Sequence, residues 1–166
     1  MSEAPQRSYG VADHKEIAEL DGKQILQAMI DGKLPTPPMA KTLAFDLVEV
    51  GEGFAAFEGR PDETFLNPMG VVHGGWALTL VDSAAGCAAM TLLPVGAGYT
   101  TIETKVNFSR PILADTGKVR AESRIVSRGA RILSAEARVV DATGRVLAHG
   151  TSTLMVLGEG RAARRS

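Results

Sequence analysis

Apolar residues return at two different spacings in the first 60 residues, and each spacing predicts a different element. Between residues 15 and 31, Ile, Leu and Met side chains recur at roughly helical intervals, which predicts a helix, although Gly22 weakens the pattern. The Pro-rich segment 34–38 is expected to be extended, because proline and the residue before it resist helix formation. The runs TLAFDLVEV and GFAAFEG flank the turn 51–53 and predict a β-hairpin.

The longest weakly charged segment, residues 74–93, predicts a buried helix. It reaches the length of a membrane span, but Asp82 lies near its centre, where a carboxylate costs about 2.5–3.5 kcal/mol. The surrounding Ala, Gly, Ser and Thr residues offset little of that cost, so we expect no membrane segment. Four strand-like runs follow, at 100–109, 117–126, 132–141 and 145–156. Consecutive strands joined by short turns form an antiparallel sheet, so the expected fold class is α+β, with the helix packed on one face.

Composition narrows the class of protein. The 166 residues include a single cysteine, which excludes a disulfide framework and a zinc finger and agrees with a reducing, cytoplasmic compartment. The polar start MSEAPQRSYG shows no secretory signal. The net charge of −1 does not indicate a surface for nucleic acid or for a membrane. No group of side chains has the spacing of a metal site, so we predict no metal.

The charge is unevenly distributed along the chain. Residues 1–60 carry six basic and ten acidic groups, whereas residues 101–166 carry twelve basic and six acidic groups. Between them, from residue 64 to residue 102, Asp82 is the only charged residue when histidine is neutral. An ionised carboxylate in an apolar helix needs donors, water or a raised pKa. Asp82 is therefore either a structural residue satisfied by nearby donors or a catalytic base or nucleophile in a cleft.

The segment before this helix, NPMGVVHGG, provides a second candidate feature. The first amides of a helix have no intrahelical partners, and glycines leave them accessible to an acceptor such as an oxyanion. Asp82 follows His73 by nine residues, which is about 13.5 Å along a helix. It cannot reach an oxygen held at the start of its own helix. If both features serve one site, Asp82 must come from a second subunit, as in a two-fold dimer with antiparallel helices.

The motifs NPMGVVHGGWALTLVDSAAG, TTIETKVNFSRPI and GRVLAHGTSTLMV resemble the PaaI-like branch of hotdog-fold acyl-CoA thioesterases, a branch related to phenylacetate degradation. The resemblance covers roughly residues 40–156. It implies a curved antiparallel sheet wrapped around one long helix, here with an extra N-terminal helix, and assembly as a homodimer or homotetramer. The expected domains are therefore an N-terminal helical extension (1–39), the hotdog domain (40–157) and a flexible tail (158–166).

The resemblance also implies roles for individual residues. Asp82 would activate water or attack the thioester, and the backbone N–H of Gly74 would polarise the thioester carbonyl. Asn67 would hold the water or the carbonyl, and His73 would shape the loop. Thr101 would assist the carboxylate through its hydroxyl.

One hydroxyl has an alternative, and one position departs from what relatives offer. Thr100 is the alternative to Thr101 as the hydroxyl at the start of the third strand. Other relatives place a hydroxyl one helical turn after the carboxylate, where this chain has Gly86.

Arg128, Gly129 and Arg131 lie at a strand turn where family members often meet the nucleotide end of coenzyme A, and we expect them to bind it. Arginines at an exposed hairpin are also common without a ligand. The expected substrate is an acyl- or aryl-CoA, with coenzyme A as part of the substrate and no separate cofactor. A hotdog-fold hydratase or dehydratase and a non-catalytic acyl-CoA-binding regulator remain as alternatives.

Overall fold

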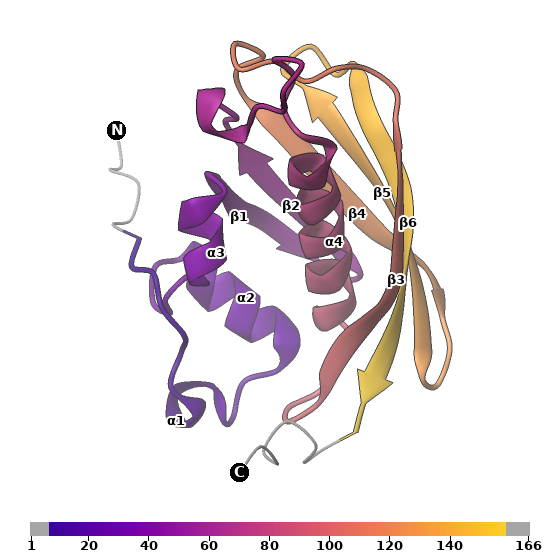
Figure 1. The fold of residues 1–166 in the computed structure, drawn as a ribbon. Helices are drawn as coiled ribbons and strands as arrows, with labels where there is room; N and C mark the ends of the chain where they lie inside the picture. Colours follow the sequence, from indigo (N-terminus) through magenta and orange to yellow (C-terminus); the bar gives the residue numbers. More distant parts are fainter. Residues whose placement is uncertain (1–6, 159–166) are drawn as a thin grey trace.

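Six strands form one antiparallel sheet in the order β1-β2-β4-β5-β6-β3 (Figure 1). The strands are β1 (Phe45–Gly51), β2 (Phe54–Gly59), β3 (Gly98–Phe108), β4 (Val119–Arg128), β5 (Ile132–Asp141) and β6 (Val146–Leu157). The structure, a computed structural model, describes residues 7–158, so the expected tail lies almost wholly outside the described residues. The predicted α+β sheet is confirmed, and β1 and β2 form the predicted hairpin.

The long helix α4 (Gly74–Met90) runs along one face of this curved sheet, as Figure 1 shows. Its inward side chains are small or aliphatic, including Leu80, Val81 and Ala84, which have no exposed surface. They pack on β2, β4 and β5, where Phe57, Ala121 and Val139 are also buried, so one core lies between helix and sheet. This is the hotdog arrangement that the sequence predicts, with α4 as the central helix.

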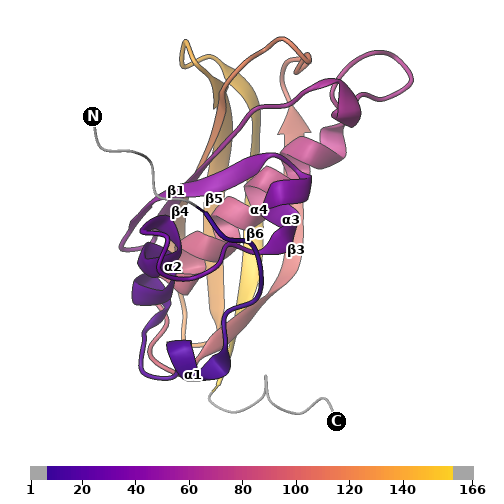
Figure 2. The same ribbon diagram turned by 90° about the vertical axis from the view of Figure 1, so that its left-hand side faces the viewer.

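The N-terminal segment differs from the prediction of a single helix over 15–31. It forms α1 (His14–Ile17) and α2 (Gly22–Ile30), because Asp21 starts a new helix through a capping box with Gln24. Gly22 is required there, since a Cβ at this position would lie 1.9 Å from the backbone oxygen of Met90. Figure 2 shows α2 on the same side of the sheet as α4.

A third short helix, α3 (Pro38–Thr42), was not expected and begins inside the segment predicted to be extended. The prediction was wrong at Pro38 because proline is well suited to the first helical position, where its missing N–H is not needed. The indole of Trp76 on α4 donates a hydrogen bond of 2.8 Å to the carbonyl of Leu43, just after α3. This bond ties the start of α4 to the segment that leads into β1.

Strand β3 is an edge of the sheet and pairs only with β6 among the described strands. Its register shifts between Thr101 and Glu103, which marks a β-bulge. Strands begin or end up to three residues away from the predicted limits, and β4 continues through half of the predicted turn 127–130. Within residues 7–158, no helix has the length and apolar character needed to cross a membrane.

Candidate active site

The start of α4 leaves one backbone donor unused. His73 is the N-cap residue, and its Nδ1 accepts a hydrogen bond of 3.0 Å from the N–H of Gly75. The carbonyl of His73 accepts from the N–H of Trp76 at 2.9 Å. The N–H of Gly74 has no acceptor among residues 7–158. The helix dipole places partial positive charge at this amide, so Gly74 can polarise a carbonyl oxygen bound there.

Asn67 lies on the loop next to this amide, and both residues line a hollow of about 450 Å³. The side-chain oxygen of Asn67 accepts from the N–H groups of Met69 and Val71 at 2.9 and 3.2 Å. The oxygen therefore shapes the loop, and the amide NH₂ of Asn67 remains as a donor. Arg110, which the sequence analysis passed over, also lines the hollow, and its guanidinium donates to the carbonyl of Val146 at 2.7 Å.

Asp82 is half-buried on the side of α4 that faces β3. Its Oδ1 accepts a hydrogen bond of 3.1 Å from the hydroxyl of Thr101 and one of 2.9 Å from the hydroxyl of Thr104. Its Oδ2 has no hydrogen-bond partner among the described residues. The carboxylate is thus held in place through one oxygen, and the other is available to a water or a substrate.

Thr104 is the residue of this site that the sequence analysis missed. In a regular strand, Thr101 and Thr104 would point to opposite faces, because side chains alternate. The bulge between Thr101 and Glu103 adds one residue and turns both hydroxyls toward the helix. The Thr104 hydroxyl also lies 2.9 Å from that of Ser152 on β6. Thr100, the alternative to Thr101, is exposed and makes no hydrogen bond to Asp82.

Gly74 and Asp82 are far apart within one chain. Eight residues separate them on α4, which corresponds to about 12 Å along the helix axis. The hollow lined by Gly74 accordingly does not include Asp82. Within the described chain, the unused amide of Gly74 and the open carboxylate oxygen of Asp82 therefore lie apart.

The chain is similar in sequence and fold to known proteins. The sequence profile of the thioesterase superfamily matches residues 69–148. The solved structure of a thioesterase family protein from Silicibacter pomeroyi is 30% identical, with a TM-score of 0.68, and the alignment covers 74% of this chain and 90% of that chain. The chain belongs to the thioesterase superfamily. Its class is therefore that of the thioester hydrolases, and its fold is the PaaI-like hotdog.

Two further relatives agree with this assignment. The structure of the PaaI protein from the phenylacetic acid degradation operon of E. coli has a TM-score of 0.72 at 22% identity, covering 86% of this chain and 97% of that chain, which shows the shared fold. A Halobacterium salinarum protein described as an esterase is 42% identical over 62 residues, 34% of this chain. That match spans only 41% of the length of the curated relative.

The three residues expected to meet coenzyme A lie at the other end of this thioesterase fold. Arg128 ends β4, and its guanidinium donates to the carbonyl of Leu92, just beyond the C-terminus of α4, at 3.2 Å. Gly129 donates its N–H to the carbonyl of Ile132 across the β4–β5 turn, and Arg131 is exposed in the same turn. Within one chain, the structure does not bring this turn to Gly74 or Asp82.

Cys87, the only thiol of this family member, is not arranged as a nucleophile. Burial, with a smaller contribution from the charge of Asp82, raises the pKa of Cys87 to about 12, so the thiol stays protonated at neutral pH. Among residues 7–158, no three His, Cys, Asp or Glu side chains gather in a way that could hold a metal ion. Asp82 and Cys87 are the ionisable side chains of α4, so Asp82 is the one that carries a charge at neutral pH.

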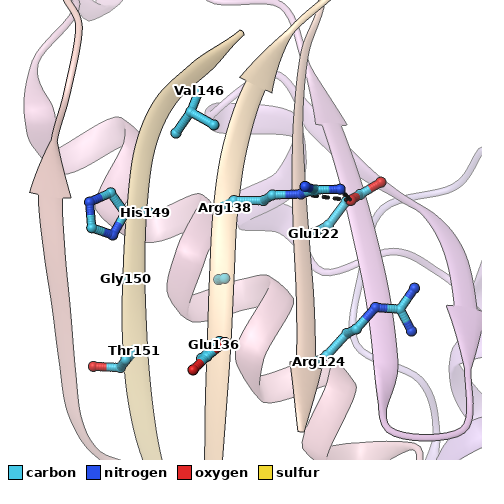
Figure 3. A pocket seen from close by; sticks show the side chains of 9 residues that line it. Glu122, Arg124, Glu136, Arg138, Val146, His149, Gly150 and Thr151 are labelled. Carbon is cyan, nitrogen blue, oxygen red and sulfur yellow. Dashed lines mark hydrogen bonds and ion pairs between the residues drawn. The ribbon is translucent and has the colours of Figure 1, made fainter. Parts of the chain in front are cut away.

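A larger hollow, of about 730 Å³, lies on the face of the sheet turned away from α4 (Figure 3). Arg138 and Glu122 form an ion pair of 3.0 Å across it, and His149, Glu136 and Arg124 stand on neighbouring strands. It contains none of the predicted site residues. Glu122 is already paired with Arg120 and Arg138, so the size of this hollow alone does not make it a catalytic site.

Proposed function

We propose that the protein hydrolyses an acyl- or aryl-coenzyme A thioester to the free acid and coenzyme A. The observation that carries this proposal is the pair of unused groups on α4, namely the free N–H of Gly74 and the open Oδ2 of Asp82. Thioester hydrolysis needs a group that activates water and a donor that stabilises charge on the carbonyl oxygen. These two groups meet both needs without a serine or cysteine nucleophile.

In the proposed reaction, the Asp82 carboxylate takes a proton from a water as the water oxygen attacks the thioester carbon. The carbonyl oxygen becomes negative and accepts a hydrogen bond from the N–H of Gly74, while the NH₂ of Asn67 helps to hold the carbonyl or the water. The carbon–sulfur bond then breaks, and the proton on Asp82 passes to the leaving thiolate. Thr101 and Thr104 keep the carboxylate oriented throughout.

The proposed active unit is a homodimer, because the two groups lie about 12 Å apart in one chain. Strand β3 is an edge strand, and exposed edges favour pairing with another chain. Ile102 and Phe108 on this strand are 55% and 58% exposed, and Leu78 on α4 is 38% exposed. A two-fold dimer through this apolar face would set Gly74 of each chain against the carboxylate of the other, giving two equal sites. Two such dimers could pair as a homotetramer.

The nucleotide end of coenzyme A is proposed to bind at the turn that carries Arg128, Gly129 and Arg131. Arg128 is anchored at Leu92, ten residues after Asp82, which is about 15 Å along the axis of α4. In an antiparallel dimer, this turn would lie beyond the start of the other α4, at a distance that an extended coenzyme arm can cover. The cytoplasm is the proposed compartment, which the single cysteine supports.

Subunit complementation tests the shared site. An Asp82→Asn chain and a Gly74→Pro chain are each expected to be inactive as homodimers. After unfolding and refolding as an equal mixture, half of the dimers are mixed, and each mixed dimer has one intact site, so about a quarter of the wild-type activity should return. A mixture that remains as inactive as its components would refute the shared site.

The type of reaction is tested with a panel of acyl-CoA substrates. Release of free thiol, measured with a thiol-reactive dye, supports hydrolysis. A change in the acyl group without thiol release would identify a hydratase or dehydratase instead. Tight binding with neither change would identify a non-catalytic acyl-CoA-binding protein. The latter two outcomes would each overturn the proposal.

A further inference from the structure

The space one helical turn beyond Asp82 is filled by a side chain from β3. Gly86 lies four residues after Asp82, on the same side of α4. A Cβ at Gly86 would lie 2.3 Å from the hydroxyl oxygen of Tyr99 and 2.9 Å from the ring carbon that carries it. The end of the phenol ring therefore occupies the volume that a side chain at position 86 would need.

Tyr99 belongs to the same row of β3 side chains as the hydroxyl that holds Asp82. It precedes Thr101 by two residues, so both side chains point toward α4. The helix face next to β3 thus meets, in order, the Thr101 hydroxyl at Asp82 and the Tyr99 ring at Gly86. A molecule bound against Asp82 on this helix face would have the Tyr99 ring about one helical turn away, at Gly86.

Behind the Tyr99 ring lies an apolar cluster. Ala85, Ala89, Leu133 and Leu154 are all at most 1% exposed, and Tyr99 packs against them. Burial first, and then the charges of Cys87 and Asp82, raise the pKa of Tyr99, so its hydroxyl stays protonated at any ordinary pH.

The Tyr99 hydroxyl forms no hydrogen bond with another described residue. Among residues 7–158, the only buried side-chain oxygen or nitrogen without a hydrogen-bond partner belongs to Asp46. The Tyr99 hydroxyl therefore keeps some exposed surface, while the ring packs on the apolar cluster.

We propose that Tyr99 is a specificity-determining residue whose ring forms the end wall of the acyl pocket and limits the length of the acyl group. This inference rests on the proposed thioesterase function. The carbonyl carbon must sit at Asp82, and the charged coenzyme must reach solvent, so the acyl chain takes the buried apolar direction. In this chain that direction leads inward from Asp82 past Gly86 and ends at the Tyr99 ring, whereas the coenzyme arm would leave along the surface toward the turn of residues 128–131.

The size of the ring, more than its hydroxyl, sets the limit. Replacing Tyr99 with alanine would empty a volume lined by the apolar cluster, which can accept methylene groups of a longer acyl chain. Each methylene group transferred into such a site favours binding about fourfold, so two additional groups give about fifteenfold. Replacing Tyr99 with phenylalanine keeps the ring and should keep the length limit.

The test measures kcat/KM for butanoyl-, hexanoyl-, octanoyl- and decanoyl-CoA in the wild type and in Tyr99→Ala, Tyr99→Leu and Tyr99→Phe. We expect the ratio of long- to short-chain kcat/KM to rise about tenfold or more in Tyr99→Ala, to rise less in Tyr99→Leu, and to stay within about twofold in Tyr99→Phe. The ratio does not depend on the fraction of folded enzyme, because both substrates are measured with the same enzyme preparation. Tyr9→Ala, at a surface tyrosine far from this row in the sequence, serves as the matched control and should leave the ratio unchanged.

Unchanged ratios in both Tyr99→Ala and Tyr99→Leu would overturn the inference while leaving hydrolysis intact. An equal shift in Tyr99→Phe would also overturn it, because the hydroxyl would then set the limit. If the wild type releases no thiol from any acyl- or aryl-CoA, the proposed function itself fails, and the inference fails with it.

Discussion

Replacing Gly74 with proline removes a single backbone donor and little else. Gly74 is the first residue of α4, a position where proline is well tolerated because its N–H has no intrahelical partner. His73 has φ −59° and ψ 133°, which is the extended conformation that a residue before proline prefers. The N–H that would be lost has no acceptor among residues 7–158, so the fold loses no hydrogen bond in this region.

The added Cβ has one close neighbour. It would lie 2.9 Å from the ring of Phe108, a contact that proline and alanine share. Gly74→Ala places a Cβ at the same point and keeps the N–H, so it is the matched control. Losing one donor to the transition-state oxyanion typically lowers kcat by about 10²–10³, or about 2.7–4 kcal/mol. We expect Gly74→Pro to be slower than Gly74→Ala by that factor.

The assay follows thiol release from one acyl-CoA at saturating concentration, with the melting temperature recorded for both variants. Similar melting temperatures would show that proline leaves the fold intact. If Gly74→Pro and Gly74→Ala then turn over at the same rate, the amide of Gly74 does not bind the oxyanion. An equal and large loss in both would instead assign the effect to the Cβ beside Phe108.

Three other predictions depend on single contacts. Thr104→Val should lower kcat by about tenfold in the same thiol-release assay, because Asp82 loses a charge-assisted hydrogen bond of roughly 1.5 kcal/mol. Thr104→Ser keeps the hydroxyl and should retain most of the activity. Arg128→Glu with Arg131→Glu should raise KM for acyl-CoA at least severalfold with kcat nearly unchanged, and an unchanged KM would remove both arginines from the site. Hydrogen bonds, foremost from Thr143, lower the pKa of Asp141 to about 2. The ionised carboxylate therefore stabilises the fold at pH values above its unfolded pKa. This stabilisation is lost as the pH falls from about 4 to about 2. Circular dichroism during acid titration should show that loss in the wild type and not in Asp141→Asn.

The sequence predicts the main architecture because its strongest signals are local. Alternating runs around the turn 51–53 and the long weakly charged segment 74–93 correspond to the β1–β2 hairpin and to α4. The isolated charge of Asp82 and the glycines at the start of α4 likewise stand out from composition alone. Polar groups inside an apolar segment are costly to bury, and for that reason they are informative in the sequence.

The features that the sequence does not reveal depend on contacts between distant segments. Thr104 faces Asp82 only because of a bulge, and nothing in the local pattern of β3 marks that bulge. The division of the N-terminal helix depends on Asp21 and on the fit of Gly22 against the end of α4. The bulge and the helix break both depend on which backbone segment packs against them. The spacing of apolar residues along the sequence carries no information about that partner.

The small residues of α4 then have a more specific explanation than close packing in general. Gly74 meets the ring of Phe108, Gly86 meets the hydroxyl end of Tyr99, and between them Asp82 meets the hydroxyls of two threonines. All of these partners come from β3, which is one of the two edges of the described sheet. The strand that positions the carboxylate is therefore also an edge strand that a second copy of the chain can contact. In the proposed dimer, contact with a second chain would fix β3 and, through it, Asp82, so assembly and the orientation of this carboxylate are expected to depend on the same element.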